Sequence, residues 1–329
     1  MSLYLLIDCG GTKTAFHTYV STNDPDLLAL HQTTYLNKDF DSFYELLQHF
    51  IDHIPSVNTN YSAILIAAAG SISNDSVKLT NLDWTISQKE IKKRFPRYSI
   101  KTNIYLINDL EATAYYPLYS GSADNIIRIG GTSEYITDGS YTVLSVGTGF
   151  GTAFAAYESE NRKYVICSGE GGHSTFAPST KDQQRLFDYY QRQDPDKEIS
   201  VEFFLSGEGL SRIYTYLSDG NTKAPEDISK GASKKCPICL QSIDLFFEIL
   251  SCSARNVALF PVPKKGLYLT GGVITHLLPF LDHKTFIRHF TRSEKMSVLL
   301  KKIPVYIIDG HQAPIHGLLY YLKNQMRFH

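Results

Sequence analysis

The sequence has no excess of either charge. Its 32 basic residues are balanced by 33 acidic ones, which gives a formal net charge of −1 at pH 7. Nothing in this balance predicts binding to nucleic acid or to a membrane surface. The most basic stretch, residues 283–302, alternates basic with apolar residues, so we interpret it as a solvated helix face. We therefore expect no nucleic-acid partner and no membrane partner.

Long hydrophobic runs and export features are also lacking. No uninterrupted apolar run approaches the roughly 20 residues that a membrane-spanning helix needs. Asp8 interrupts the first apolar run, and no basic segment precedes that run as it would in a signal peptide. The five cysteines are an odd number scattered along the chain, which is typical of reduced thiols. These features predict a cytoplasmic protein.

Two of the cysteines form the motif Cys236-Pro-Ile-Cys239. A structural zinc site needs a full set of ligands, and neither a second cysteine pair nor a clear Cys/His partner lies nearby in the sequence. We interpret the two residues as incidental cysteines near the start of a helix. A redox-active pair is the alternative.

The composition is that of a globular protein, and it is long enough to form two packed cores. The chain has 329 residues, of which 43% are hydrophobic. In the first third, short turns join β-like runs, which predicts antiparallel strands at 3–8, 14–20 and 28–35. Ser42 and Glu45 form a capping box before apolar residues at helical spacing. Then we expect a strand at 62–70, a helix near 86–95 and a strand at 103–109.

A similar order of elements recurs in the second half. Residues 142–157 read as strand, glycine-rich turn and strand, and 164–166 offer a third strand. We expect helices across 181–217 and 238–259, a strand at 267–272, a helix near 274–290, a strand at 304–309 and a last helix at 314–326. Two α/β lobes of this kind would face each other across a cleft, where ligands commonly bind.

Two glycine-rich turns occupy equivalent places in the two halves. The first contains Asp8, Gly10, Gly11, Thr12, Lys13 and Thr14, and the second contains Gly147, Thr148 and Gly149. Glycine has no Cβ, so the backbone N–H groups of such turns can converge on an anion, and threonine hydroxyls add donors. A tight hairpin would explain either turn alone. Together they predict a clamp on a polyphosphate, although they match neither a Walker-type loop nor a dinucleotide fingerprint.

Two further features suggest where a nucleotide would bind. Asp8 ends the first strand, where its carboxylate could hold Mg²⁺ directly or through water, because Mg²⁺ keeps several of its waters. The alternative is that Asp8 only caps the hairpin turn. Gly271 and Gly272 lie between a strand and a helix and would let a flat nucleoside ring approach the backbone. On their own, they are also an ordinary strand-to-helix turn.

The stretches DCGGTKT, INDLEATA, SVGTGFG and LTGG, in this order, resemble the superfamily that contains the sugar kinases, actin and the heat-shock chaperone ATPases. Those proteins bind ATP between two ribonuclease-H-like lobes in an actin-like ATPase fold. The segments SGEGGHSTFAP at 168–178, EFFLSGEGL at 202–210 and IPVYIID at 303–309 are similar to the bacterial glucokinase family. The resemblance covers essentially the whole chain.

The resemblance implies an α/β protein with two lobes and an inter-lobe cleft. Its small lobe would comprise residues 1–109 and 312–329, and its large lobe residues 110–311. It also implies an ATP-dependent enzyme that phosphorylates the 6-hydroxyl of glucose at the entry to glycolysis, with ATP and Mg²⁺ as cofactors. Glucose and ATP would be its small-molecule ligands, and it would be a homodimer.

A sugar site is expected at Asn108 and Asp109, after the strand 103–109. Phosphoryl transfer to a sugar hydroxyl needs a base, and we assign that role to Asp109, as the resemblance also implies. The Asn108 amide could bind the sugar, whereas the alternative for this pair is to cap a helix at 110–116. The resemblance further implies that Glu170, His173 and Glu202 bind the hexose. It also places Asn81 near the sugar.

Some features depart from the family pattern. Lys13 stands where the family commonly has Asn, and the segment 67–75 lacks a proline often found there, which leaves the exact sugar open. The cysteine cluster and helix-turn-helix of the related repressors are absent, which disfavours a transcription regulator. The alternatives are a kinase for another hexose or amino sugar, and a nucleotide-binding sugar sensor or assembly protein that transfers nothing. The donor could be ATP, ADP or polyphosphate.

Overall fold

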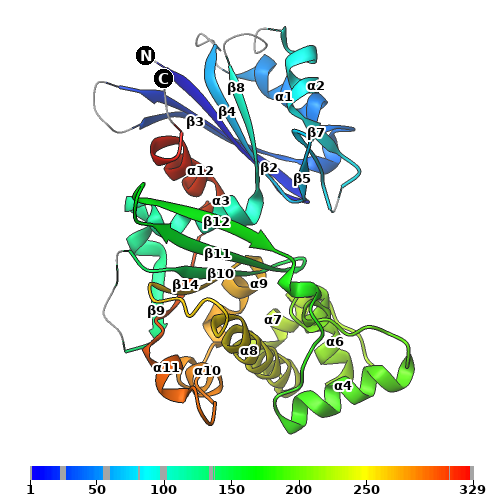
Figure 1. The fold of residues 1–329 in the computed structure, drawn as a ribbon. Coiled ribbons are helices and arrows are strands. Elements are labelled where there is room, and N and C mark those ends of the chain that lie inside the picture. Colours follow the sequence, from blue (N-terminus) through cyan, green and yellow to red (C-terminus); the bar gives the residue numbers. More distant parts are fainter. Residues whose placement is uncertain are drawn as a thin grey trace. The chain divides into compact units, whose positions relative to one another are not determined.

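A computed structural model describes residues 2–22, 27–54, 60–80, 82–96, 102–132, 136, 138–310 and 312–326. The chain forms two compact units, Met1–Ser122 with Gln312–His329 and Ala123–His311 (Figure 1). It leaves the first unit once and returns to it with its last helix. Each unit contains its own mixed α/β core.

The first unit is built on a five-stranded sheet with the order β3-β2-β1-β4-β8. Its strands are β1 (Leu3–Cys9), β2 (Lys13–Ser21), β3 (Leu27–Leu36), β4 (Tyr61–Ala68) and β8 (Asn103–Asn108). β1, β2 and β3 pair antiparallel, as predicted, whereas β4 and β8 continue the sheet in parallel.

Helices cover both faces of this sheet (Figure 1). Leu5 and Ile7 point to the face covered by α1 (Phe43–His53) and α2 (Gln88–Arg94), whereas Tyr4 and Leu6 point to the face covered by α12 (Ala313–Asn324). This alternation follows from the two-residue period of a strand. Strand β1 is therefore buried on both sides.

The predicted capping box at α1 forms in a shifted version. The Ser42 hydroxyl accepts a hydrogen bond from the Glu45 N–H at 3.2 Å, but the Glu45 carboxylate accepts from the Asp41 N–H rather than from Ser42. The sequence did not predict the small sheet of β5 (Ile72–Ser73), β6 (Ser76–Lys78) and β7 (Thr85–Ser87). Strands of two or three residues are too short to show an alternating pattern.

The division between the units follows Ser122. The expected lobe boundary followed residue 109, before α3 (Asp109–Ala114) and the short helices η3 (Tyr116–Leu118) and η4 (Ser120–Asn125). Helix α3 packs on α12 so closely that a Cβ at Gly317 would overlap the Ala112 carbonyl oxygen. This contact keeps α3 in the first unit.

The second unit repeats the topology of the first. Its sheet has the order β12-β11-β10-β13-β14-β9, formed by β9 (Ile126–Gly130), β10 (Tyr141–Val146), β11 (Phe150–Glu158), β12 (Lys163–Gly169), β13 (Gly266–Thr270) and β14 (Val305–Ile308). As in the first unit, three antiparallel strands are followed by two parallel ones. The predicted recurrence of elements is thereby confirmed. The antiparallel edge strand β9 was not predicted.

Helices complete the second unit. They are η5 (Gly171–His173), α4 (Lys181–Gln193), α5 (Val201–Phe204), α6 (Gly207–Leu217), α7 (Pro225–Ser233), α8 (Pro237–Ala258), α9 (Gly272–Leu277), η6 (Leu278–Phe280), α10 (His283–Phe290) and α11 (Ser297–Lys302). The single helix expected near 274–290 is broken at η6, where Pro279 has no N–H to donate. Within the described residues, α8 alone is long and apolar enough to cross a membrane, but 67% of its most apolar window is buried in the protein.

Candidate active site

Asp8 and Asn108 lie at one edge of the sheet in the first unit. Asp8 pairs with Ala67 on β4, and the following residue of β4, Ala68, pairs with Asn108 on β8. These three strands are parallel, so their carboxyl ends meet at this edge, where α/β sheets commonly bind ligands. Asp109 follows Asn108 directly and begins α3. The structure thus brings together the acidic residues predicted from the first half of the sequence.

Asp109 is the first residue of a helix rather than the last residue of a strand. Its carboxylate accepts a hydrogen bond from the Leu110 N–H at 2.8 Å, which fixes its orientation. Burial raises the pKa of Asp109, and backbone hydrogen bonds at the helix start lower it in part. The result is a held carboxylate that binds a proton more readily than an exposed aspartate does.

Asn108 caps this helix, which confirms the alternative role given to it. Its side-chain oxygen accepts from the Leu110 N–H at 3.0 Å and from the Glu111 N–H at 3.2 Å. Its amide nitrogen donates to the Gly70 carbonyl at 3.1 Å. Among the described residues, these contacts leave one amide hydrogen of Asn108 for a ligand.

Asp8 has no cationic partner among the residues that the structure describes. Desolvation raises its pKa to about 7, and the negative charge of Asp109 contributes to the rise. Within the described part of the chain, no hydrogen bond or ion pair reaches this carboxylate, so nothing there supports a role in capping the turn. No group of three or more His, Cys, Asp or Glu residues able to hold a metal occurs in those ranges. Asp8 and Asp109 are therefore an acidic pair that a cation would stabilise.

Asn37 holds the first glycine turn in shape. Its amide nitrogen donates to the Gly10 carbonyl at 2.8 Å, and its backbone N–H donates to the Thr12 carbonyl at 2.9 Å. Its side-chain oxygen accepts from the Thr14 hydroxyl at 2.8 Å, and both side chains are buried. Thr14 therefore supports the turn from inside instead of facing solvent, whereas Thr12 and Lys13 are exposed.

Sequence reasoning missed Asn37. It ends the run of β3, and its partners lie more than twenty residues earlier in the chain. An asparagine at a strand end followed by a polar turn was the only local signal.

The second glycine turn meets the starts of two helices. Between β10 and β11, the Gly147 N–H donates to the Gly149 carbonyl, and the Gly147 carbonyl accepts from the Gly207 N–H at the start of α6, both at 2.9 Å. A Cβ at Gly207 would lie 3.9 Å from the Val273 side chain on α9. Gly271 has a φ of +105°, and a Cβ there would overlap the backbone of Val146.

Two of these glycines border open space. A Cβ at Gly147 or at Gly272 would have no heavy atom within 4 Å. The backbone at these two positions is therefore open to a ligand, as the approach of a flat ring or a phosphate chain requires.

The predicted sugar residues of the second unit lie close to this turn. Glu170 and His173 flank η5, with 3.8 Å between the Glu170 Oε2 and the His173 Nε2, and both side chains are largely exposed. Glu202, on α5, accepts from the Phe150 N–H at 2.8 Å. Helix α5 is tied to the same loop, because the Val201 N–H donates to the Ser174 carbonyl at 2.9 Å.

Glycine also allows Glu202 to approach the turn. A Cβ at Gly149 would overlap the Glu202 carboxylate, and a Cβ at Gly172 would overlap the Phe150 carbonyl. The second glycine turn and Glu202 are therefore in direct contact. Asn81, the remaining predicted sugar residue, lies outside the described residues.

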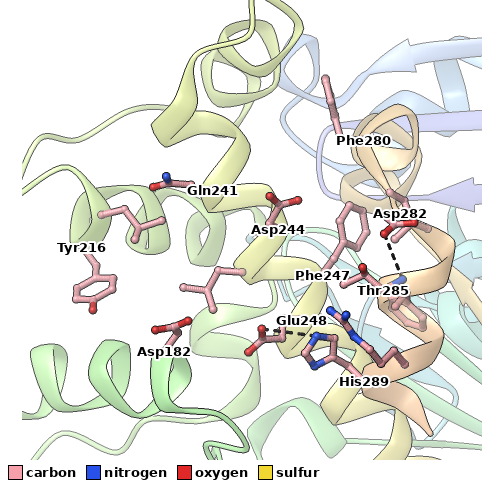
Figure 2. Close-up of a pocket in the computed structure, with 15 residues that line it drawn as sticks. Asp182, Tyr216, Gln241, Asp244, Phe247, Glu248, Phe280, Asp282, Thr285 and His289 are labelled. Carbon is pink, nitrogen blue, oxygen red and sulfur yellow. Dashed lines mark hydrogen bonds and ion pairs between the residues drawn. The ribbon is translucent and has the colours of Figure 1, made fainter. Parts of the chain in front are cut away.

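A separate cavity of about 540 Å³ lies between α8 and α10 in the same unit. Figure 2 shows Glu248 and His289 pointing toward each other at its wall, 3.8 Å apart. The Glu248 carboxylate also accepts from Thr180 and Gln183. No predicted site residue lines this cavity. It is not part of the candidate active site.

Comparisons with known proteins agree with this arrangement. A family model described as Glucokinase matches residues 5–325. A glucokinase from Colwellia psychrerythraea is 30% identical, and the match covers 97% of this chain and 96% of that protein. The crystal structure of a glucokinase from an Antarctic psychrotroph is 25% identical, has a TM-score of 0.83 and is matched over 98% of this chain and 99% of its own.

A more distant structure supports the fold alone. It is a ROK-family glucokinase from Streptomyces griseus in complex with glucose and AMPPNP, 17% identical, with a TM-score of 0.62 and coverage of 96% of this chain and 97% of its own. The family model matches almost the full length, and the relatives are similar from end to end. The chain therefore belongs to the glucokinase family of sugar kinases.

Proposed function

We propose that this protein transfers the γ-phosphoryl group of ATP to the 6-hydroxyl of glucose, giving glucose 6-phosphate and ADP at the entry to glycolysis. The observation that carries the proposal is the held carboxylate of Asp109 beside Asp8, in a chain of the glucokinase family. The glycine turns and the sugar residues supply the remaining parts.

Asp109 acts as the general base. As the sugar oxygen attacks the γ-phosphorus, its proton passes to the Asp109 carboxylate, and the bond from phosphorus to the leaving ADP oxygen breaks. The raised pKa of Asp109 makes its carboxylate a better proton acceptor. The hydrogen bond from Leu110 holds the carboxylate, so little reorientation is needed during the transfer.

The two glycine turns bind the phosphates of ATP. Exposed backbone at Gly11 and Thr12, the Lys13 ammonium and the turn at 147–149 supply donors or positive charge. The space beside Gly272 receives the nucleoside. Asp8 would hold Mg²⁺ directly or through water, and its unpaired carboxylate with a raised pKa fits a cation there. When bound, Mg²⁺ neutralises charge on the phosphates.

Glu170, His173 and Glu202 bind the hexose, and Asn108 adds its remaining amide hydrogen. Carboxylates and imidazole recognise sugar hydroxyls through directed hydrogen bonds. A sugar that lacks one of these hydroxyls leaves the protein group that would bond it unpaired in the complex. Asn81 belongs to this set as a further sugar contact.

The test is an assay of product formation over a panel of sugars and donors. Glucose, mannose and glucosamine are each supplied with ATP, ADP or polyphosphate, in the presence and absence of Mg²⁺, and sugar phosphate is quantified directly. We expect glucose with ATP and Mg²⁺ to give the highest kcat/KM. A higher value for another sugar or donor would overturn the assignment of substrate or donor.

We also propose that the protein is cytoplasmic and works as a homodimer. The balanced surface charge and the buried position of α8 support the first statement. Light scattering of the purified chain tests the second, and a monomer at assay concentrations would contradict it.

A further inference from the structure

The motif Cys236-Pro-Ile-Cys239 lies at the start of the longest helix that the structure describes. Cys236 is the N-cap residue of α8, Pro237 is its first helical residue and Cys239 lies in its first turn. The two thiols are therefore three residues apart on one turn, at the end of a helix where unpaired N–H groups favour negative charge. Helix α8 has 22 residues, so this end is well formed.

The backbone before Cys236 is tightly constrained. The hydrogen bonds that end helix α7 include one from the Lys235 N–H to the Ala232 carbonyl at 2.8 Å and one from the Cys236 N–H to the Gly231 carbonyl at 3.0 Å. Lys235 has a φ of +62°, which lets the chain reverse between α7 and α8. Cys236 is thus fixed by both helices, so its position relative to Cys239 is set by the fold.

Gly231 makes room for the pair. A Cβ at this position would lie 2.5 Å from the Cys239 sulfur and 3.7 Å from the Cys236 Cβ. Lys223 is also close, with its Nζ 3.8 Å from the Cys239 sulfur and 4.8 Å from the centre of the Tyr214 ring. A cation and a close-fitting backbone therefore contact the Cys239 sulfur.

The two thiols differ in reactivity. Hydrogen bonds from the Cys239 backbone N–H and thiol lower the pKa of Cys236, and the charge of Lys223 lowers it further. Burial raises the pKa of Cys239. Cys236 is partly exposed, whereas Cys239 is buried. Since the thiolate is the nucleophile, Cys236 suits the attacking role and Cys239 suits the resolving role.

The other cysteines have no such arrangement. Cys9 and Cys252 are buried, and desolvation raises the pKa of Cys9 to about 12. Cys167 is exposed on β12. In the described ranges, no group of His, Cys, Asp or Glu residues could hold a metal, so the pair is not part of a zinc site there.

We propose that Cys236 and Cys239 form a redox-active dithiol, which is oxidised by an anionic low-molecular-weight disulfide such as oxidised glutathione. Lys223, Lys234 and Lys235 give this surface the positive charge that attracts such a disulfide. Cys236, Cys239 and Lys223 are not among the proposed sugar and nucleotide residues, and the proposal does not depend on the kinase activity.

The reaction occurs in two exchanges. The Cys236 thiolate attacks one sulfur of the disulfide, whose S–S bond breaks and releases one thiolate. Cys239 then loses its proton to solvent and attacks the Cys236 sulfur of the mixed disulfide, which releases the second thiolate. The protein loses two electrons and two protons in total, and one disulfide is reduced to two thiols.

The first test maps the products of oxidation. The reduced full-length protein is incubated with oxidised glutathione, remaining thiols are alkylated, and the peptides are identified by mass spectrometry. We expect an intramolecular disulfide between Cys236 and Cys239, and only a mixed disulfide with glutathione at Cys167. The proposal is wrong if Cys236 ends only as a mixed disulfide, or if it reacts no faster than Cys167.

The second test separates the roles of the residues. Cys239→Ser should trap the mixed disulfide on Cys236, whereas Cys236→Ser should leave Cys239 almost unreactive in the folded protein. Lys223→Gln should slow the alkylation of Cys236 at neutral pH by about threefold to tenfold and shift its pH profile upward. Lys230→Gln removes an equal charge from α7, where Lys230 pairs with Asp227, and is the matched control. If Cys236 is alkylated at the same rate in the two lysine variants, Lys223 does not lower the pKa of Cys236. If Cys239 is reactive in Cys236→Ser, Cys236 is not the nucleophile.

Discussion

Replacing Asn37 by alanine tests how the first glycine turn is held. The side chain makes two hydrogen bonds of 2.8 Å, to the Gly10 carbonyl and from the Thr14 hydroxyl. Asn37 and Thr14 are buried, with exposed fractions of 2% and 0%, so water does not readily replace the lost partner. Leaving a buried polar group unpaired costs about 1–3 kcal/mol, so we expect Asn37→Ala to destabilise the first unit by about 2–5 kcal/mol.

The chain contains a convenient reporter for this measurement. Its single tryptophan, Trp84, is 7% exposed in the core of the first unit, so its fluorescence follows the unfolding of that unit in urea. The KM for ATP is measured under native conditions in parallel. We expect it to rise at least several-fold, because Gly10 and Thr14 lose the side chain that joins them across the turn.

A matched control uses Asn103, which is exposed on β8 of the same sheet. Asn103→Ala should change the free energy of unfolding by less than about 0.5 kcal/mol. A double-mutant cycle of Asn37→Ala with Thr14→Val should show coupling, since each residue is the partner of the other. If Asn37→Ala matches the Asn103→Ala control in both stability and KM, the reasoning about this turn is refuted.

Three other predictions use the same assays. Asp109→Asn should lower kcat by about 10²–10⁴-fold while calorimetry shows that glucose still binds, and near-normal turnover would exclude Asp109 as the base. Burial raises the pKa of Asp8 from its ordinary value of 3.8 to about 7 in the folded protein. Between these two pH values the folded state binds more protons than the unfolded state, so the free energy of unfolding falls as the pH rises through this window. Asp8→Asn should reduce that slope in the Trp84 unfolding assay, because only the contribution of Asp109 then remains from this pair, and an unchanged slope would contradict the assignment. Gly271→Ala should destabilise the protein by about 1–3 kcal/mol, because of its φ of +105° and the overlap with Val146, whereas Gly272→Ala, with open space at its Cβ, should cost less in thermal unfolding.

Local patterns in the sequence predicted most of the elements. Local signals predict the strands β1, β2 and β3 and the start of α1. These signals are the pattern of apolar residues, the turn residues between strands and the helix cap, and each of them spans only a few residues. The glycine turns were found for the same reason. The strands β5, β6, β7 and β9 were missed because they are short or lie at an edge with a weak pattern.

Features that depend on distant contacts were not predictable. The role of Asn37 rests on partners 23 and 27 residues away. The packing of α3 on α12 depends on the close approach of Gly317 to Ala112, two residues about 200 positions apart in the chain. The raised pKa of Asp8 comes first from its burial and then from the charge of Asp109, and both arise only after β1, β4 and β8 have paired. The type of a residue can suggest that it belongs to a site, but the residues that it contacts are known only from the fold.

The return of α12 to the first unit has a consequence for the order of events on the ribosome. Residues 123–311 are contiguous, so the second unit can complete its core as soon as its own segment has emerged. The first unit emerges earlier but must wait, because Ile315, Leu318, Leu319 and Leu322 cover the sheet face that contains Tyr4, Leu6, Ala63 and Leu65. Until α12 has been translated, that apolar face lacks this cover, and a nascent chain halted before α12 would present it to chaperones.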